Sequence, residues 1–151
     1  MMGRVLKPVP PQEWPALHND MRQQNFPETP ETFTETRPFL KKVNLFGVYV
    51  NNQRLATFIL GPKEGDGAFL DVICVPGMEG RWASRPVLRD MATLAFESYG
   101  LRYVWIQTHT PAALKAALQA GFSIISGSAP GQPFLILTPD RLNLNRKEEE
   151  N

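Results

Sequence analysis

The sequence predicts an α+β fold with a mixed central sheet, and the order of its strand-like and helical segments supports this. Three strand-like runs, at 45–50, 54–60 and 68–75, follow one another, and the Asn-rich turn at 51–53 joins the first two as a hairpin. These runs predict an antiparallel meander. A helical pattern then separates 68–75 from a further strand-like run at 103–107. Because a helix crossover joins parallel strands, we expect those two strands to pair in parallel.

The segments before the meander are predicted as an edge strand and two short helices. The strand is expected over 3–9, and a helix is expected over 11–24, where apolar residues recur at spacings of three and four. A second helix is expected to begin at Pro30 and to end at Thr36, because Pro38 would interrupt its hydrogen bonding.

The segments after the central strand are predicted as two helices and three strands. The first helix is expected to end at Gly100 as a C-terminal cap. The second helix is expected to begin after Thr110 as its N-cap and to end at Gly121. Two closing strands are expected at 122–125 and 133–137.

Length and composition indicate a globular protein rather than a membrane or disordered one. A chain of 151 residues fits one domain, expected over 1–140 and followed by a charged tail over 141–151. The net charge of +1, without a basic stripe, argues against nucleic-acid binding. The single cysteine, Cys74, excludes an internal disulfide and argues against a metal site. No segment has the length of a membrane span or signal peptide, so we expect a cytoplasmic protein.

The stretch from 68 to 100 is a candidate anion site. The run 68–75 is almost entirely apolar, as in a strand buried on both faces, and a loop of glycines and small residues at 77–84 leads into the helix. The first amides of a helix are unpaired and carry partial positive charge, so a pyrophosphate would fit there. The alternative is that the loop only serves the turn from strand to helix.

The order of elements resembles the GNAT superfamily of N-acetyltransferases over nearly the whole chain. The resemblance is carried by Val75-Pro76, by Gly80 in the following loop, and by a later helix that ends with Gly121-Phe122. It implies an α/β/α sandwich of six or seven strands with helices on both faces. The segment Gly-Arg-Trp-Ala-Ser at 80–84 also resembles the corresponding sequence in acetyltransferase-like proteins of tailed bacteriophages.

The resemblance implies acetyl-CoA as cosubstrate, with no metal. Loop amides would hold the pyrophosphate, arginines would add charge, and the edge of the central strand would hold the pantetheine arm. The residues with these implied roles are Ile73, Cys74, Val75, Gly80, Arg81, Trp82, Ala83, Ser84 and Arg85, with Thr110 and Ala113 on the later helix.

Three positions depart from the family pattern. Glu79 stands where the family has Gln or Arg, Trp82 stands at its second Gly, and Ala117 replaces a Tyr that commonly acts as general acid. A missing acid slows an acyl transfer by about 10²- to 10⁴-fold without abolishing it.

Asp71 is the candidate general base, because it is the acidic residue within the central strand and burial would raise its pKa. The alternatives are a structural partner for a backbone amide or an arginine, or a position facing solvent. Tyr49 and Thr57 could face an acceptor pocket, although core packing or a solvent-exposed face explains them equally simply.

Two main functional hypotheses follow. The first is an N-acetyltransferase that transfers acetyl from acetyl-CoA to an amine of unknown identity. The second is a phage virion structural or assembly protein that keeps the fold without the chemistry and binds other phage structural proteins. A phage-encoded enzyme would be located in the host cytoplasm, and the structural protein would be located in the virion. A homodimer is compatible with either hypothesis. A third hypothesis, modification of DNA bases, has little support because a basic patch is missing.

Overall fold

The computed structural model describes residues 3–24, 29–78, 81–108, 111–125 and 133–142. In these residues the chain forms a seven-stranded sheet in the order β1-β2-β3-β4-β5-β7-β6, with four α-helices. The elements are β1 (Val5–Pro8), η1 (Pro11–Glu13), α1 (Trp14–Gln23), α2 (Phe33–Lys42), β2 (Asn44–Val50), β3 (Gln53–Leu60), β4 (Gly67–Cys74), α3 (Arg85–Thr93), η2 (Leu94–Ser98), β5 (Tyr103–Gln107), α4 (Pro111–Ala120), β6 (Ser123–Ile124), β7 (Phe134–Leu137) and η3 (Pro139–Arg141). The predicted mixed α+β sheet is confirmed.

The contacts divide the chain into two compact units. The first comprises Met1–Pro62 with Asp71–Val87, and the second comprises Lys63–Leu70 with Leu88–Asn151. β4 and α3 each contribute residues to both units. In the part of the chain that is described, no helix is long and apolar enough to cross a membrane.

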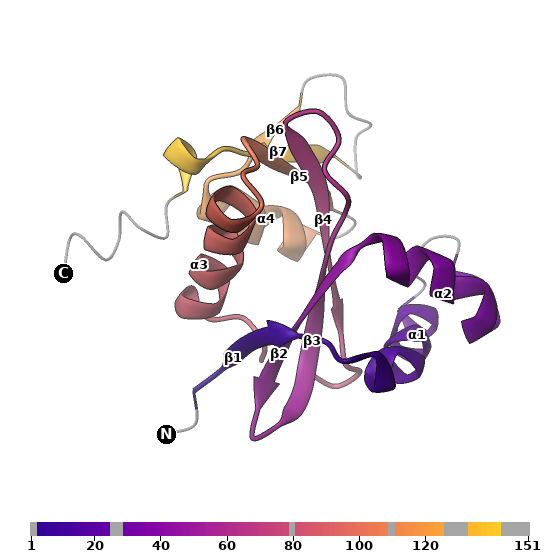
Figure 1. The fold of residues 1–151 in the computed structure, drawn as a ribbon. Coiled ribbons are helices and arrows are strands. Elements are labelled where there is room, and N and C mark those ends of the chain that lie inside the picture. Colours follow the sequence, from indigo (N-terminus) through magenta and orange to yellow (C-terminus); the bar gives the residue numbers. More distant parts are fainter. Residues whose placement is uncertain (1–2, 25–28, 79–80, 109–110, 126–132, 143–151) are drawn as a thin grey trace. The chain divides into compact units, whose positions relative to one another are not determined.

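The first unit is built on the antiparallel strands β1, β2 and β3. Asn51 and Asn52 adopt positive φ angles of 52° and 62°, which closes the β2–β3 hairpin tightly and confirms the predicted turn. Figure 1 shows α1 and α2 side by side next to this hairpin. The fully buried side chains of this unit include Leu17, Met21, Leu40, Val48, Ile59 and Leu60.

The prediction for α2 is wrong at both ends. The helix begins after Thr32, whose Oγ1 accepts the amide of Glu35 at 3.2 Å and donates to the Glu35 carboxylate at 2.8 Å. A threonine N-cap that accepts an amide of the first turn is a stronger start signal than Pro30. Pro38 lies inside the helix instead of ending it, because the apolar face that includes buried Leu40 stabilises the last turns.

The second unit contains the parallel pairing that the crossover predicted. β4 pairs with β5 through Gly67–Phe69, β5 pairs antiparallel with β7, and β7 pairs antiparallel with β6. Gly67 is required at its position because a Cβ there would collide with the ring of Tyr103.

The predicted turns at Gly100 and Gly121 are confirmed, although α3 itself ends at Thr93 and a π-helix, η2, continues to Ser98. The predicted burial of β4 is wrong. Gly100 and Gly121 have φ angles of 65° and 113°, a conformation that glycine adopts without strain. The middle of β4 is half-buried rather than covered on both faces, and among 69–74 only Ile73 is fully buried. The prediction from the apolar run therefore overestimated the burial of this strand.

Candidate functional site

The end of β4 is the first part of the candidate site. Ile73 is buried, and Cys74 and Val75 are half-buried. The amide of Val75 donates to the carbonyl of Leu55 on β3 at 2.8 Å. The amide of Cys74 donates to the side-chain Oε1 of Gln24 at 3.0 Å, and the Gln24 Nε2 donates to the Cys74 carbonyl. Both backbone groups of Cys74 are therefore paired with one side chain.

The loop after β4 contains a run of amides that have no acceptor among the described residues. Gly77, with φ of 88°, turns the chain, and the amides of Met78 and Arg81 donate to the carbonyls of Val75 and Met78. Within the described residues the next four amides, those of 82–85, donate no hydrogen bond. The predicted cofactor residue Gly80 lies outside the described residues, as does Glu79.

The start of α3 is capped by the loop itself. Ser84 Oγ accepts the amide of Val87 at 3.3 Å, which makes Ser84 the N-cap, and Pro86 has no amide hydrogen. Arg81 and Arg85 are exposed, and Arg4 Nε donates to the carbonyl of Arg81 at 2.7 Å. In the first unit, this loop thus brings amides without an acceptor among the described residues together with the guanidinium groups of Arg4, Arg81 and Arg85.

The side chain of Trp82, at one of the positions that depart from the family pattern, packs against the first unit's sheet. Its ring packs edge-on against Phe58 of β3, with the ring centroids 5.4 Å apart and the planes at 85°. The side chain is therefore turned toward the sheet of the first unit. An aromatic contact fixes a loop that in the resembling family has a glycine at this position.

Asp71 is half-buried, and its Oδ1 accepts the amide of Val72 at 2.9 Å. This bond matches the structural alternative for Asp71, while its role as general base stays a prediction. Thr110 lies outside the described residues, and Ala113 is exposed in the first turn of α4, so their predicted cofactor roles stay predictions. Ala117 is 7% exposed on the same helix.

A buried polar network in the first unit was missed by the sequence analysis. Arg54, whose side chain is 7% exposed, pairs with Glu13 at 3.3 Å and with Asp20 at 3.1 Å, and donates to Thr57 Oγ1 at 2.9 Å. Tyr49 OH donates to Glu13 Oε1 at 3.0 Å. The Asp20 contact is an ion pair without the alignment of a hydrogen bond. The sequence signal was weak, since these residues come from η1, α1, β2 and β3.

Burial changes the pKa values of two members of this network, Asp20 and Tyr49. It raises the pKa of the Asp20 carboxyl, and the nearby Arg54 charge acts in the opposite direction. Burial and the Glu13 carboxylate raise the pKa of Tyr49 to about 12. Tyr49 and Thr57 are buried, which agrees with core packing rather than an open acceptor pocket.

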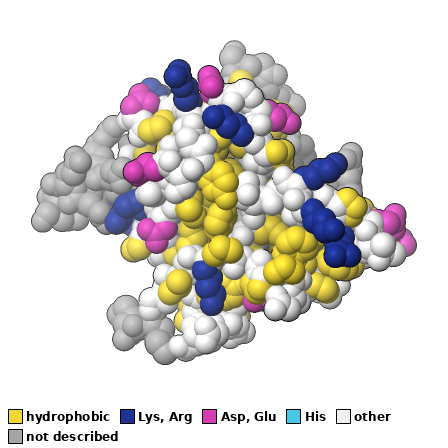
Figure 2. Space-filling model, in the orientation of Figure 1, with side chains coloured by type: hydrophobic (Ala, Val, Ile, Leu, Met, Phe, Trp, Pro, Cys, Tyr) yellow, Lys and Arg dark blue, Asp and Glu magenta, His cyan; other side chains and the backbone are white. Residues whose placement is uncertain are grey.

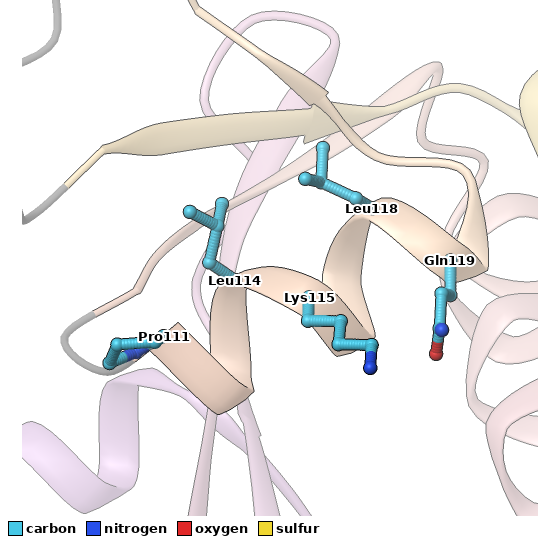
Figure 3. Close-up of a pocket in the computed structure, with 5 residues that line it drawn as sticks. All are labelled: Pro111, Leu114, Lys115, Leu118 and Gln119. Carbon is cyan, nitrogen blue, oxygen red and sulfur yellow. The ribbon is translucent and has the colours of Figure 1, made fainter.

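The second unit has an apolar hollow along α4. It has a volume of about 400 Å³ and is lined by Pro111, Leu114, Lys115, Leu118 and Gln119. Figure 3 shows Leu114 and Leu118 projecting to one side of the helix, with Lys115 and Gln119 on the other. These side chains include no acid, base or nucleophile suited to acyl transfer at neutral pH.

On the face drawn in Figure 2, Lys and Arg side chains are dispersed among hydrophobic and acidic ones. Among the described residues no group of three or more His, Cys, Asp or Glu side chains is placed to hold a metal ion.

The mixed seven-stranded sheet with four helices is a GNAT-like α+β fold, which solved structures of spermidine N-acetyltransferases share. A structure of the spermidine/spermine N-acetyltransferase SpeG from Vibrio cholerae, in mutant form, matches with a TM-score of 0.75 and 16% identity over 95% of this chain and 98% of that one. The same enzyme in complex with CoA and spermine matches with a TM-score of 0.78 and 15% identity, over 91% and 96% of the chains. Its dodecameric form gives a TM-score of 0.76 and 16% identity over 95% and 97%.

The sequence comparisons gave no match. No family model matches this chain. No curated protein matches it either. At these identities the structural similarity establishes the fold, and the resemblance to phage proteins stays a prediction.

Proposed function

We propose that this protein is an N-acetyltransferase that uses acetyl-CoA as donor and an amine as acceptor. The observation that carries the proposal is the run of four amides at 82–85, which have no acceptor among the described residues and lead into α3. Oxygens of a pyrophosphate are the acceptors that such amides and helix starts bind. Arg81 and Arg85 would add charge-assisted hydrogen bonds.

The fold supports the same donor. SpeG, which has this fold, has been solved in complex with CoA and spermine. Because one fold can serve several functions, the assignment depends on the loop of this chain as well as on the neighbour. Spermidine and spermine are the first acceptors to test, together with other primary amines.

The proposed reaction is direct transfer. The neutral amine nitrogen attacks the thioester carbonyl, the carbon–sulfur bond breaks, and CoA leaves as a thiolate that takes up a proton. Asp71 is the proposed acceptor of the ammonium proton. Because Ala117 offers no acid for the thiolate, we expect turnover below that of an enzyme with both groups.

The binding test is thermal unfolding with and without acetyl-CoA. A ligand at about 100 times its dissociation constant stabilises the fold by about 2.7 kcal/mol, which raises the midpoint by roughly 5 to 10 °C at this size. Adenosine, which lacks phosphates, is the control and should give no shift. Absence of a shift with millimolar acetyl-CoA would overturn the proposal.

The activity test follows CoA release chromatographically, because thiol reagents would also react with the thiol of Cys74. Asp71→Asn keeps an oxygen that can accept the Val72 amide and removes the base. We expect kcat to fall by about 10²-fold or more, with acetyl-CoA affinity unchanged. Asp66→Asn, at an exposed turn, is the matched control. Equal loss in both variants would remove Asp71 from the mechanism.

A further inference from the structure

Gln24 makes an unusual set of contacts at the end of α1. Its Nε2 donates to the carbonyl of Cys74 and to the carbonyl of Asp20, the latter at 3.2 Å, and its Oε1 accepts the Cys74 amide at 3.0 Å. One planar carboxamide therefore satisfies both the donor and the acceptor of one strand residue. This is the pairing that the N–H and C=O of a residue on an adjacent antiparallel strand would provide.

The contact lies on a particular edge of β4. Successive residues of a strand direct their backbone groups to opposite edges, and the amide of Val75 is bonded to β3. The backbone groups of Cys74 consequently face the edge opposite to β3. The pairing of β4 with β5 extends only over Gly67–Phe69. On this edge of β4, the backbone N–H and C=O of Cys74 are hydrogen-bonded to the Gln24 side chain and not to a neighbouring strand.

We infer that Gln24 is a displaceable placeholder, which occupies the Cys74 backbone pair until an N–H and a C=O of the pantetheine arm of acyl-CoA replace it. The inference rests on the proposed function. The pantetheine arm is an extended chain with secondary amides, so an N–H of one amide and a C=O of another can pair with Cys74 as the backbone of an adjacent strand does. The Gln24 carboxamide and the pantetheine arm cannot both occupy the N–H and C=O of Cys74. The ligand and the side chain therefore compete for these two groups.

The position of Gln24 makes the exchange feasible. The residue is exposed and directly follows the last residue of α1, so its flexible side chain can rotate into water without moving the helix. In water its carboxamide regains hydrogen bonds, which keeps the cost of displacement small. The backbone amide of Gln24 bonds the Asp20 carbonyl independently of the side chain.

The test compares Gln24→Ala with Gln23→Ala, an exposed neighbour in the same helix that undergoes the same chemical change. Removing a competitor should tighten acetyl-CoA binding by roughly five- to tenfold, mainly through faster association, whereas Gln23→Ala should bind like the wild type. Stopped-flow kinetics and isothermal titration give both quantities. Adenosine bisphosphate, the nucleotide half of CoA, has no pantetheine amide, so its affinity should be the same in all three proteins.

Hydrogen exchange of the Cys74 amide provides a readout that is independent of affinity. Without ligand, this amide should exchange slowly in the wild type and in Gln23→Ala, and faster in Gln24→Ala. Saturating acetyl-CoA should restore protection in Gln24→Ala. Failure of the ligand to protect this amide in Gln24→Ala would overturn the inference, even if the affinities changed as expected.

The outcomes separate the inference from the proposed function. Equal affinity of the wild type and Gln24→Ala for acetyl-CoA would overturn the placeholder and leave the acetyltransferase proposal standing. Weaker binding with faster dissociation in Gln24→Ala would also overturn it, because Gln24 would then contact the bound ligand. If no variant binds acetyl-CoA, the proposed function itself fails.

Discussion

Two polar regions of the first unit use their hydrogen-bonding groups in opposite ways. In the network around Arg54, the guanidinium, two carboxylates and two hydroxyls are paired with one another and largely removed from solvent. In the loop at 81–85, four successive amides have no acceptor within the described residues, and Arg81 and Arg85 are exposed. The first region is saturated, and the second is open.

The difference separates scaffold from candidate site. Buried polar groups that pair with one another hold α1 against the β2–β3 hairpin and are largely removed from the reach of a ligand. Open donors on a rigid support are available without reorganisation, which lowers the cost of binding an anion. Substitutions in the saturated network should therefore change stability, and substitutions in the loop should change binding.

The largest effect is expected for Arg54→Met. The change leaves Asp20 buried without its counter-charge, and breaking a buried ion pair from one side costs about 3–5 kcal/mol. Urea unfolding should report this loss. Arg37→Met, at an exposed position of α2, is the matched control and should change stability by less than about 0.5 kcal/mol. A cost below about 1 kcal/mol for Arg54→Met would show that the network is not a structural anchor.

Within the open loop, the Trp82 ring differs from the amides and arginines because it packs against Phe58 of the sheet. Trp82→Ala removes the contact with Phe58 and should lower the free energy of unfolding by about 2 kcal/mol, since the side chain is half-buried. A double-mutant cycle with Phe58→Leu should give a coupling of about 0.5–1.5 kcal/mol. Additive effects would mean that the two rings stabilise the protein independently.

Much of the fold could be predicted from the sequence because its signals are local. The Asn51-Asn52 hairpin, the Gly100 and Gly121 caps and the parallel crossover each follow from a few adjacent residues. The second helix was misplaced because the prolines at 30 and 38 were given more weight than the N-cap at Thr32. Packing of an apolar face compensates for one missing hydrogen bond, and that compensation is not visible in local sequence.

The site was predictable only where it is continuous in sequence. The loop from 77 to 85 is one such stretch, so its residues could be named in advance. The pairing of Gln24 with Cys74 joins residues 50 positions apart. The Arg54 network likewise joins four elements. Such contacts depend on tertiary arrangement, and no spacing in the chain predicts them.

Within the open loop, charge can be tested separately from size. Ala83→Glu places a carboxylate among the amides at 82–85, and Ala83→Gln adds a side chain of the same size without the charge. We expect Ala83→Glu to weaken acetyl-CoA binding at least about tenfold relative to Ala83→Gln, equivalent to about 1.4 kcal/mol. Both variants should unfold at the wild-type midpoint because Ala83 is exposed. Equal affinities would argue against an anion at the loop.

The smallest effect, and the one that tests the saturated network most finely, is expected for Tyr49→Phe. The variant loses the bond to Glu13, so at neutral pH it should be less stable than the wild type by about 1 kcal/mol. The pKa of Tyr49 is raised from 10.0 to about 12, so the folded state retains this proton where the unfolded state has lost it. The unfolding free energy of the wild type should therefore fall relative to the variant as pH rises from about 10 through about 12.

The measurement is the difference in unfolding free energy between the wild type and Tyr49→Phe across that pH range, which cancels the titration of the other tyrosines and the lysines. The difference should be constant below about pH 10 and should then narrow. A difference that does not change with pH would mean that the Tyr49 hydroxyl is not held in its neutral form by the fold, and the network would be less closed than its hydrogen bonds indicate.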